Sequence, residues 1–447
     1  MVTSRLLEAF LARPVKCHLL SEGEVPAGTE YSAWAAAREK SYRREGVRKL
    51  TSQETGPSIA AAEPGLWKHE SWRFSVGKTV RAEGWETEIA LIQRIPLTGA
   101  PSRFVPIRFA ANNRLSASDK TMAAFEAIAL AKALGTKTGT VKIVHGEKPA
   151  MVSVNAAALS RAVHRKMSQV ASLLSAVSPP DTVINRHGPE CGFHDRCRKD
   201  AIGKDELSLL SNLTGKERAK YRGKGIFTVS QLAYTFRPRR RTKRLAERPE
   251  RYHHALKALA IRERKIHIFG NPELPMDGTP VFLDVEGLPD RDFYYLVGVR
   301  VEGPDGTEHR SLRADSPADE KCVWEDFLGI LSEADRPTLL HYGSFEKTFL
   351  KKMCERYGGS PEPSAAATAI ASATNLLAVI YARIYFPAHS NGLREIARLL
   401  GFEWSDRSAP VAGSSRRRTG GRSGSGPCRR TGQEHPVEMA GLQEPSA

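Results

Sequence analysis

The stretch GTPVFLDVEGLPDRDFYYLVGVRV, which runs from Gly278 to Val301, decides the fold of this chain. It opens with a short apolar run that is partly β-branched and bounded by turn residues, and such a run predicts a buried strand. Asp284 and Glu286 follow at once, and side chains two apart on a strand point to the same face. The two carboxylates should therefore project together. Residues 293–301 predict a second strand, with the turn at 290–292.

Two adjacent carboxylates at the end of a buried strand repel each other. Mg²⁺ or Mn²⁺ would offset that repulsion, because both ions prefer hard oxygen ligands. A solvated strand end that carries two acids by chance is the alternative interpretation. A third acid, Glu346, follows the predicted strand 337–342 and begins a helix at 347–357. A helix dipole and a metal could both hold a carboxylate there, although acids are also common at ordinary helix starts.

Length and charge narrow the classes of function. The 447 residues suffice for two or three domains, each with its own core. The formal net charge of +17 indicates a polyanionic partner, and nucleic acid is the commonest one. A generally basic surface, or charge gathered in unfolded segments, is the alternative. No apolar run approaches the length of a membrane span, and the N-terminus lacks the apolar centre of a signal peptide. We therefore expect a cytoplasmic protein without a membrane partner.

The cysteines suggest a second candidate metal site. They are irregularly spread along the chain, which argues against a secreted disulfide framework. Cys191 and Cys197 lie six apart with His187 and His194 beside them, a pattern typical of zinc or iron–sulfur ligands, and Cys17 would supply a third thiolate. Reduced, buried structural cysteines are the alternative.

Residues 205–236 predict three short helices around a glycine turn. Thr214 and Glu217 have the spacing of a capping box, and a third helix should begin at Thr228. The turn resembles a helix-hairpin-helix unit, which offers backbone N–H groups to a phosphate, although a helical spacer is the alternative. The turn and the basic linker that follows supply candidate phosphate contacts: Lys224, Arg237, Arg239, Arg240, Arg241, Lys243 and Arg244.

Periodicity predicts the remaining elements. Residues from about 408 onward lack periodicity and the apolar side chains that form a core. They predict either a disordered segment or a segment translated out of frame. The other predicted strands and helices are strands at 86–95, 103–109 and 266–269, and helices at 120–134, 155–177, 252–265, 319–332, 375–386 and 394–400.

The chain resembles the bacterial RecB-like nucleases that carry a C-terminal RNase H-like domain. The similar segments cover roughly residues 180–406: VFLDVEGLPDRDFYYLVGVRV, HYGSFEKTFLKKM, NLLAVIYARIYFPAHSNGLREIARLLGFEW and ECGFHDRC. This resemblance implies a DEDD-type 3′–5′ exonuclease architecture in which Asp284 and Glu286 form the first acidic motif and Glu346 the second. These residues would hold two metal ions about 3.5–4 Å apart around the scissile phosphate. His341 and Tyr342 would position the attacking water or the phosphate.

The chain departs from the family pattern at its nuclease motifs. The aspartate of the family's last motif, expected beyond the GFEW segment, is absent, so we expect a C-terminally incomplete domain with impaired activity. The RecB-like half would need a Glu-x-Lys element, but the corresponding stretch RFVPIRFAANNRLSASDK contains none. Asp119 and Glu88 are poor substitutes, so that half is expected to be degenerate.

The family's cysteine pattern is also incomplete. Iron–sulfur members of the wider group use four cysteines, of which Cys17, Cys191 and Cys197 match three, while Gly188 stands at the fourth position. A complete iron–sulfur cluster is therefore not expected.

The sequence as a whole predicts an α/β multidomain protein. The leading hypothesis is a metal-dependent nuclease that acts on nucleic acid, DNA rather than RNA. A non-catalytic nucleic-acid-binding protein and a zinc or iron–sulfur structural protein are the alternatives. The expected parts are a degenerate RecB-like (PD-(D/E)xK) α+β domain at 1–200, a helix-hairpin-helix-like unit at 205–236, a basic linker and helix at 237–277, an RNase H-like α/β domain with a mixed sheet at 278–406, and a disordered or out-of-frame tail at 407–447.

Overall fold

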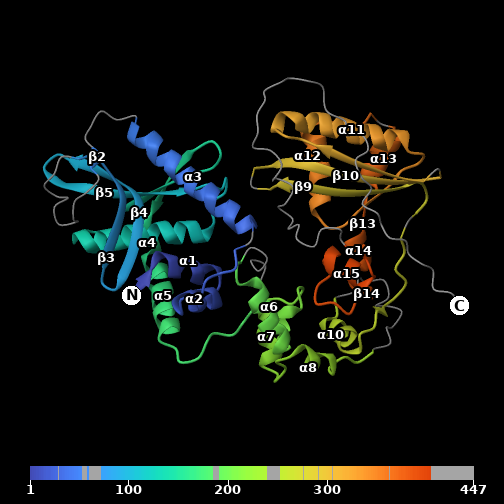
Figure 1. Ribbon diagram of the computed structural model, residues 1–447, viewed down its shortest axis with the longest axis horizontal. Coiled ribbons are helices and arrows are strands. Elements are labelled where there is room, and N and C mark those ends of the chain that lie inside the picture. The colour runs from blue at the N-terminus through green and yellow to red at the C-terminus, as the bar shows by residue number, and fades with distance from the viewer. Residues whose placement is uncertain are drawn as a thin grey trace. The chain divides into compact units, whose positions relative to one another are not determined.

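The computed structural model describes residues 1–28, 30–52, 58–59, 72–184, 191–238, 252–274, 276–289, 291–304, 306–361 and 363–403 (Figure 1). They fall into two compact units, the first comprising Met1–Asp200 and the second beginning at Ala201. The predicted tail lies outside the described residues. So do several predicted site residues: His187, Gly188, Arg239, Arg240, Arg241, Lys243 and Arg244.

The first unit is a mixed sheet with helices packed on it. Its strands are hydrogen-bonded in the order β2-β3-β4-β5-β6-β7, and β1 pairs with β4. The strands are β1 (Val2–Thr3), β2 (Ser58–Ile59), β3 (Phe74–Ala82), β4 (Trp85–Leu97), β5 (Ala100–Ala110), β6 (Thr140–His145) and β7 (Ala150–Asn155). The helices are α1 (Ser4–Ala12), α2 (Pro14–Ser21), α3 (Glu30–Ser52), α4 (Ala117–Leu134), α5 (Ala156–Leu174) and α6 (His194–Gly203).

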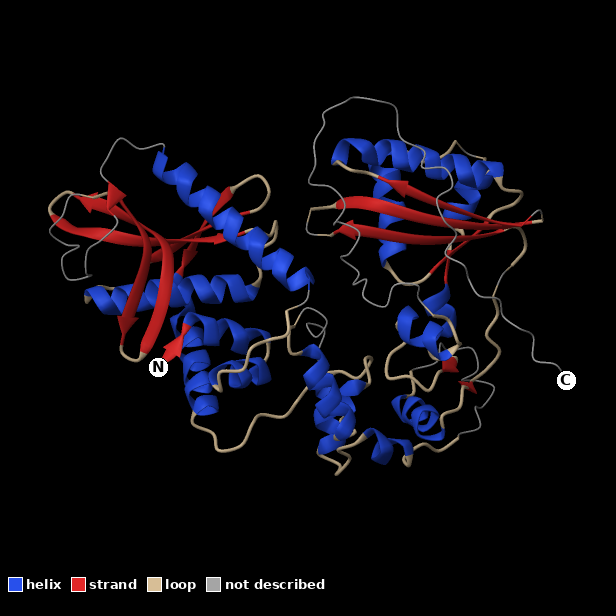
Figure 2. Cartoon of the chain, in the orientation of Figure 1, coloured by secondary structure: helices blue, strands red, loops and turns tan. Residues whose placement is uncertain are grey.

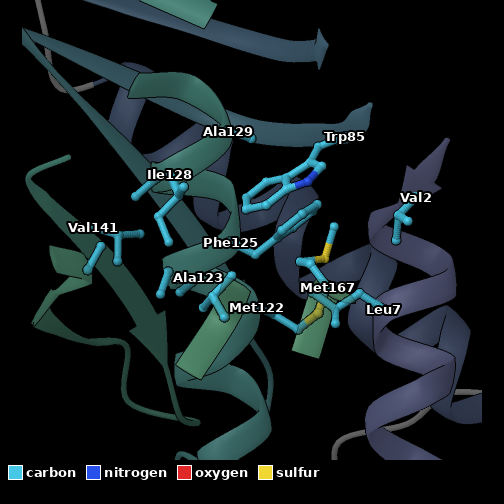
Figure 3. Packing of buried hydrophobic residues seen from close by; sticks show 14 of the residues in the cluster. Val2, Leu7, Trp85, Met122, Ala123, Phe125, Ile128, Ala129, Val141 and Met167 are labelled. Atoms are coloured by element: carbon cyan, nitrogen blue, oxygen red, sulfur yellow. The ribbon is translucent and has the colours of Figure 1, made fainter. Parts of the chain in front are cut away.

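Helix α4 forms the centre of this unit. It begins at a capping box between Ser116 and Asp119 and ends at Gly135, which adopts a left-handed conformation with φ +61°. Figure 3 shows Phe125 of α4 beside Trp85 of β4, and the two rings stack with centroids 5.4 Å apart. The predicted helix at 120–134 is confirmed. Although α4 is largely buried, no helix in the described part of the chain is long and apolar enough to cross a membrane.

The second unit begins with a small helical part. It contains a 3₁₀ helix (Leu207–Leu209), α7 (Gly215–Arg222), α8 (Val229–Ala233), α10 (His254–Glu263) and β8 (His267–Ile268). Capping boxes start both α7, through Thr214 and Glu217, and α8, through Thr228 and Gln231. Gly225 has φ +77° in the turn between them, a conformation that favours glycine. The predicted helix starts at Thr214 and Thr228 are thus confirmed.

The rest of the second unit is built on a mixed sheet with the strand order β11-β10-β9-β12-β13. Strands β9, β10 and β11 are antiparallel, whereas β12 is parallel to both β9 and β13. The strands are β9 (Pro280–Leu288), β10 (Phe293–Gly303), β11 (Gly306–Arg313), β12 (Thr338–His341), β13 (Thr374–Asn375) and β14 (Ile384–Tyr385). The helices are α11 (Glu320–Glu333), α12 (Phe345–Tyr357), α13 (Ala365–Ala371), α14 (Leu376–Ile380) and α15 (Leu393–Leu399).

Strand β9 separates an apolar face from a polar one. Val281, Leu283 and Val285 are buried in a core shared with helices α11, α12 and α13, which Figure 2 shows beside this sheet. Burial of each such side chain contributes about 1.5–3 kcal/mol. Asp284 is exposed and Glu286 half-buried on the opposite face. The prediction that both carboxylates share one face of the strand is therefore confirmed.

The predicted helix at 375–386 is wrong in its second half. Helix α14 ends at Ile380, and Ala382 adopts a left-handed conformation with φ +59°. The chain then forms β14, which pairs with β8, and the Tyr385 ring is fully buried against Leu256 and Ala260 of α10. These distant contacts replace the helical hydrogen bonds that local periodicity predicted.

A buried carboxylate ties three elements of the second unit together. Glu320 of α11 is 3% exposed. Its carboxylate accepts hydrogen bonds from the backbone N–H of Tyr294 at 2.7 Å, from the Tyr357 hydroxyl at 3.0 Å and from Arg356 at 2.8 Å. Arg356 also pairs with Asp292 in the β9–β10 turn. Since Arg356 and Tyr357 belong to α12, this network fixes α12 against β10.

We expect Glu320→Ala to lower the free energy of unfolding of the second unit by about 1–3 kcal/mol, because it leaves the N–H of the buried Tyr294 without its acceptor and removes one of the two carboxylates that pair with Arg356. Urea unfolding followed by circular dichroism would measure the change. Glu325→Ala, at an exposed acid of the same helix, is the control and should shift stability by less than about 0.5 kcal/mol. Equal shifts in the two variants would contradict the role assigned to Glu320.

Candidate active site

Three acidic side chains come from the carboxyl ends of two neighbouring parallel strands. In the parallel pairing of β9 with β12, His341 lies opposite Leu283. The chain therefore continues beyond both strands at the same edge of the sheet, with Asp284 and Glu286 on β9 and Glu346 in the first turn of α12. In open α/β sheets, ligands bind at this carboxyl edge.

The three carboxylates influence one another's protonation. Burial, followed by the charge of Asp284 and then that of Glu346, raises the pKa of Glu286 to about 7 against the opposing charge of Arg394. Glu346 is 5% exposed, and burial followed by the charge of Asp284 raises its pKa. Partial desolvation likewise raises the pKa of Asp284. The group therefore resists carrying three negative charges at neutral pH.

His341 and Glu346 face each other below this edge. The His341 Nδ1 atom lies 3.8 Å from Glu346 Oε2, and burial lowers the pKa of the imidazole, which favours its neutral form. Among the described residues, neither His341 Nδ1 nor Glu346 Oε2 has a hydrogen-bond partner. A buried carboxylate oxygen without a donor is costly, and such atoms occur where an ion or ligand completes the site. His341, predicted to position the attacking water or the phosphate, is 3% exposed and lies beside Glu346, and that role stays a prediction.

The donor set fits a divalent cation chemically. The oxygens are hard ligands, the pKa of each acid is raised by desolvation or by its neighbours, and one buried oxygen lacks a partner. As placed, however, no three His, Cys, Asp or Glu side chains in the described part of the chain converge closely enough to form a ready metal site. Asp284, Glu286 and Glu346 are thus compatible with Mg²⁺ or Mn²⁺ but would have to close around it.

Tyr342 links this edge of the sheet to a loop before α15. Its hydroxyl donates a hydrogen bond to the backbone oxygen of Asn391, and burial raises the pKa of the phenol to about 12. The next residue, Gly343, has φ +117° and donates its N–H to Asn375 Oδ1 at 3.0 Å. A left-handed glycine here lets the chain turn from β12 into α12 and place Glu346. Tyr342, predicted to position water or phosphate, therefore orients Asn391 in the structure.

The cysteines behave as core side chains. Cys191 and Cys197 are buried in a small apolar cluster with Leu19 and Phe193, whereas Cys17 belongs to the main core of the first unit. Burial raises the pKa of Cys17 to about 11 and also raises that of Cys197. In the absence of a metal, thiols of this kind stay protonated, and no three His, Cys, Asp or Glu side chains among the described residues are grouped closely enough to hold a metal ion. The described residues therefore give no support to an iron–sulfur or zinc centre, and the interpretation as structural cysteines fits better.

An ion pair lies in the part of the first unit that corresponds to the RecB-like nuclease motif. Arg108 of β5 pairs with the buried Glu126 of α4, and Glu39 of α3 accepts the backbone N–H of Ala111 at 3.1 Å. Burial raises the pKa of Glu126, although Arg108 opposes that shift. Sequence reasoning missed these residues, because Glu126 is surrounded by apolar neighbours in the α4 sequence.

The acids considered as substitutes in the first unit serve other roles. Asp119 caps α4 through Ser116. Glu88 is an exposed partner of Arg43 at 3.7 Å. Asp119 also lies close enough to Glu39 for its charge to raise the pKa of that acid.

The helical part presents two of the predicted nucleic-acid contacts. Lys224 is exposed in the turn between α7 and α8. Arg237 folds back, and its guanidinium donates to the backbone oxygens of Tyr234 and Phe236 at 2.9 and 3.0 Å. Lys224 is thus the better placed of the two for a phosphate.

Comparison with known proteins identifies the domain that holds the three carboxylates. Residues 281–416 match the family model of the RNase_H superfamily. The matched part begins in β9 and includes α12, so it contains Asp284, Glu286 and Glu346. A search of curated proteins finds no match to this chain. The C-terminal part of the chain therefore contains an RNase H-like domain, which indicates an activity related to nucleic acid.

We expect Glu286→Gln to stabilise the metal-free protein. Because folding raises the pKa of Glu286 to about 7, its charge lowers the free energy of unfolding progressively as pH rises from about 4.5 through 7. After allowance for its partial exposure, the gain should be about 1–2 kcal/mol near pH 8 and vanish near pH 4.5. Urea unfolding in EDTA would measure it.

The control for this prediction is Glu325→Gln, which changes an exposed acid outside the site. It should show no such pH-dependent gain. Mg²⁺ should stabilise the wild-type chain more than Glu286→Gln, because the variant has lost a carboxylate ligand. An equal response of both proteins to pH and to Mg²⁺ would contradict the electrostatic coupling described above.

Proposed function

We propose that residues 278–406 form a metal-dependent nuclease domain that hydrolyses phosphodiester bonds of nucleic acid. The observation that carries this proposal is the group of three acids, Asp284, Glu286 and Glu346, at the carboxyl edge of the sheet in a segment that matches the RNase_H superfamily. Domains of this superfamily typically use divalent metal ions. The 3′–5′ exonuclease polarity and the preference for DNA over RNA rest on the resemblance to RecB-like nucleases with an RNase H-like domain.

The three acids would hold Mg²⁺ or Mn²⁺ through their carboxylate oxygens. When bound, such ions lower the pKa of an attacking water and stabilise the leaving oxygen. The chain itself supplies the orientation: the neutral His341 supports Glu346, and Tyr342 keeps its proton and holds Asn391. Burial disfavours both the imidazolium of His341 and the phenolate of Tyr342, so the neutral forms of both side chains are favoured.

Asp284→Ala should reduce Mg²⁺-dependent degradation of labelled DNA by about a hundredfold or more, because it removes a charge that the transition state needs. DNA binding should remain nearly unchanged, and the two can be measured on the same purified full-length chain. Glu325→Ala is the control and should retain activity, since this acid lies on α11 outside the site. Wild-type activity in Asp284→Ala would rule out the assignment of the site.

A non-catalytic nucleic-acid-binding role is the second candidate. It is favoured by the net charge of +17 and by the exposed Lys224 in a helix-hairpin-helix-like turn. The closed pair of Arg108 and Glu126 suits a first unit that retains a degenerate RecB-like fold without catalysis. Under this alternative the chain would bind nucleic acid but show no metal-dependent cleavage that Asp284→Ala removes.

Lys224→Ala should weaken binding to DNA of any sequence and lower the salt dependence of the binding constant by about one counterion. The reason is that a phosphate contact releases a counterion, whereas it carries no sequence information. Fluorescence anisotropy at several salt concentrations would measure the slope. Lys265→Ala, which changes an exposed lysine after α10, is the control. An unchanged slope in Lys224→Ala would exclude a phosphate contact by this residue.

A further inference from the structure

Lys257 of α10 carries a buried charge and lies outside the group of three acids. It is 1% exposed. Its Nζ donates hydrogen bonds to the backbone oxygen of Phe386 at 3.0 Å and to Asn391 Oδ1 at 2.8 Å. Burial lowers the pKa of the ammonium to about 8. Apolar residues of similar volume often serve stability equally well or better than a buried charge, so this lysine points to a task other than stability.

The segment that Lys257 holds reaches the carboxylate edge on its other side. The backbone oxygen of Asn391 accepts the hydroxyl of Tyr342. Tyr342 directly follows His341, whose ring lies against Glu346. A continuous series of contacts thus runs from the Lys257 amine through Asn391 and Tyr342 to the end of β12.

The same segment is also hydrogen-bonded to α15, the helix that carries Arg394. Glu395 accepts hydrogen bonds from the N–H and the hydroxyl of Ser390, at 2.9 and 3.0 Å, and its charge opposes the loss of positive charge at Lys257. Its neighbour Arg394 lies close enough to Glu286 to lower the pKa of that acid. A shift of the segment would therefore move a positive charge relative to Glu286.

Backbone hydrogen bonds anchor other parts of this connection to the helical part of the unit. Phe269 donates its N–H to the Arg383 oxygen at 2.6 Å, and Ser211 donates its N–H to the His389 oxygen at 3.2 Å. Lys257 is linked more directly to the carboxylates, because one of its two acceptors, Asn391, also binds Tyr342. Its removal should therefore affect the edge of the sheet more than the attachment of the helical part.

We propose that Lys257 is a positioning residue for the nuclease site, which holds the 386–391 segment so that Tyr342 and Arg394 are correctly placed beside Glu346 and Glu286. This inference rests on the function proposed above. Lys257 touches neither substrate nor metal in this scheme and acts through Asn391.

Lys257→Met tests the proposal, because it keeps the length of the side chain but removes the charge and the donors. We expect kcat for Mg²⁺-dependent DNA cleavage to fall about tenfold or more, with KM nearly unchanged and the urea midpoint unchanged or higher. Lys265→Met is the matched control and should match the wild type. Wild-type kcat in a folded Lys257→Met chain would overturn the proposal.

Asn391→Ala is the second variant, and it keeps the test decisive if Lys257→Met fails to fold. It removes the side-chain acceptor of Lys257 but leaves the backbone oxygen that Tyr342 binds. It should lower kcat as Lys257→Met does. Wild-type kcat in Asn391→Ala would count against the proposal even if Lys257→Met did not fold.

A double-mutant cycle separates positioning through the segment from an independent effect. Tyr342→Phe removes the hydroxyl that binds Asn391 on the far side. If both residues act on one segment, the double variant Lys257→Met/Tyr342→Phe should lose little more activity than the poorer single variant. Multiplicative losses, as expected for independent sites, would overturn the proposed link.

Failure of the proposed function would be recognised separately, by a wild-type chain that does not cleave DNA with Mg²⁺ or Mn²⁺. Amide hydrogen exchange then tests the positioning role without any activity. Lys257→Met should speed exchange at both 386–395 and 341–346 relative to Lys265→Met, without a change in α11. Faster exchange confined to 386–395, or none, would overturn the positioning role.

Discussion

Repulsion among three carboxylates is the constraint on which the second unit depends. Asp284, Glu286 and Glu346 are placed at one edge of the sheet by the parallel pairing of β9 with β12, and burial together with the charges of the other two acids raises the pKa of Glu286 to about 7. A shift of this size corresponds to no more than a few kcal/mol, and less after solvent screening. The apolar residues on the other face of β9, such as Val281 and Leu283, bury enough surface to offset it.

Two buried charged residues, Glu320 and Lys257, hold the elements that surround this site. Glu320 fixes α12 through Arg356, and α12 carries Glu346 in its first turn. Lys257 fixes the segment that Tyr342 reaches from the other strand. Each of these supporting charges has several hydrogen-bond partners, so it holds its neighbours in place. Within the site itself, Glu346 Oε2 has no hydrogen-bond partner among the described residues, and a bound cation would compensate it.

Features that depend on nearby residues could be predicted from the sequence. Strand alternation placed Asp284 and Glu286 on one face, and the capping box placed the start of α7 at Thr214. Features that depend on distant partners could not. Lys257 binds atoms 129 and 134 residues further along the chain, and the left-handed turn at Ala382 follows from the pairing of β14 with β8. No local pattern in either segment signals these contacts.

The two units surround a buried carboxylate with different charges, and the difference indicates where a cation would be accommodated more easily. In the first unit Glu126 Oε2 lacks a hydrogen-bond partner among the described residues, as Glu346 Oε2 does, but Glu126 Oε1 pairs with Arg108, so a metal ion would have to displace a guanidinium. In the second unit Glu346 faces a neutral His341 and the charge of Asp284, so a cation would relieve repulsion rather than break an ion pair. The same residue type is therefore paired with a cationic side chain in one fold and, among the described residues, has no cationic partner in the other, where the three acids would still have to close around a metal ion. This contrast assigns the metal chemistry of the proposal to the RNase H-like domain rather than to the first unit.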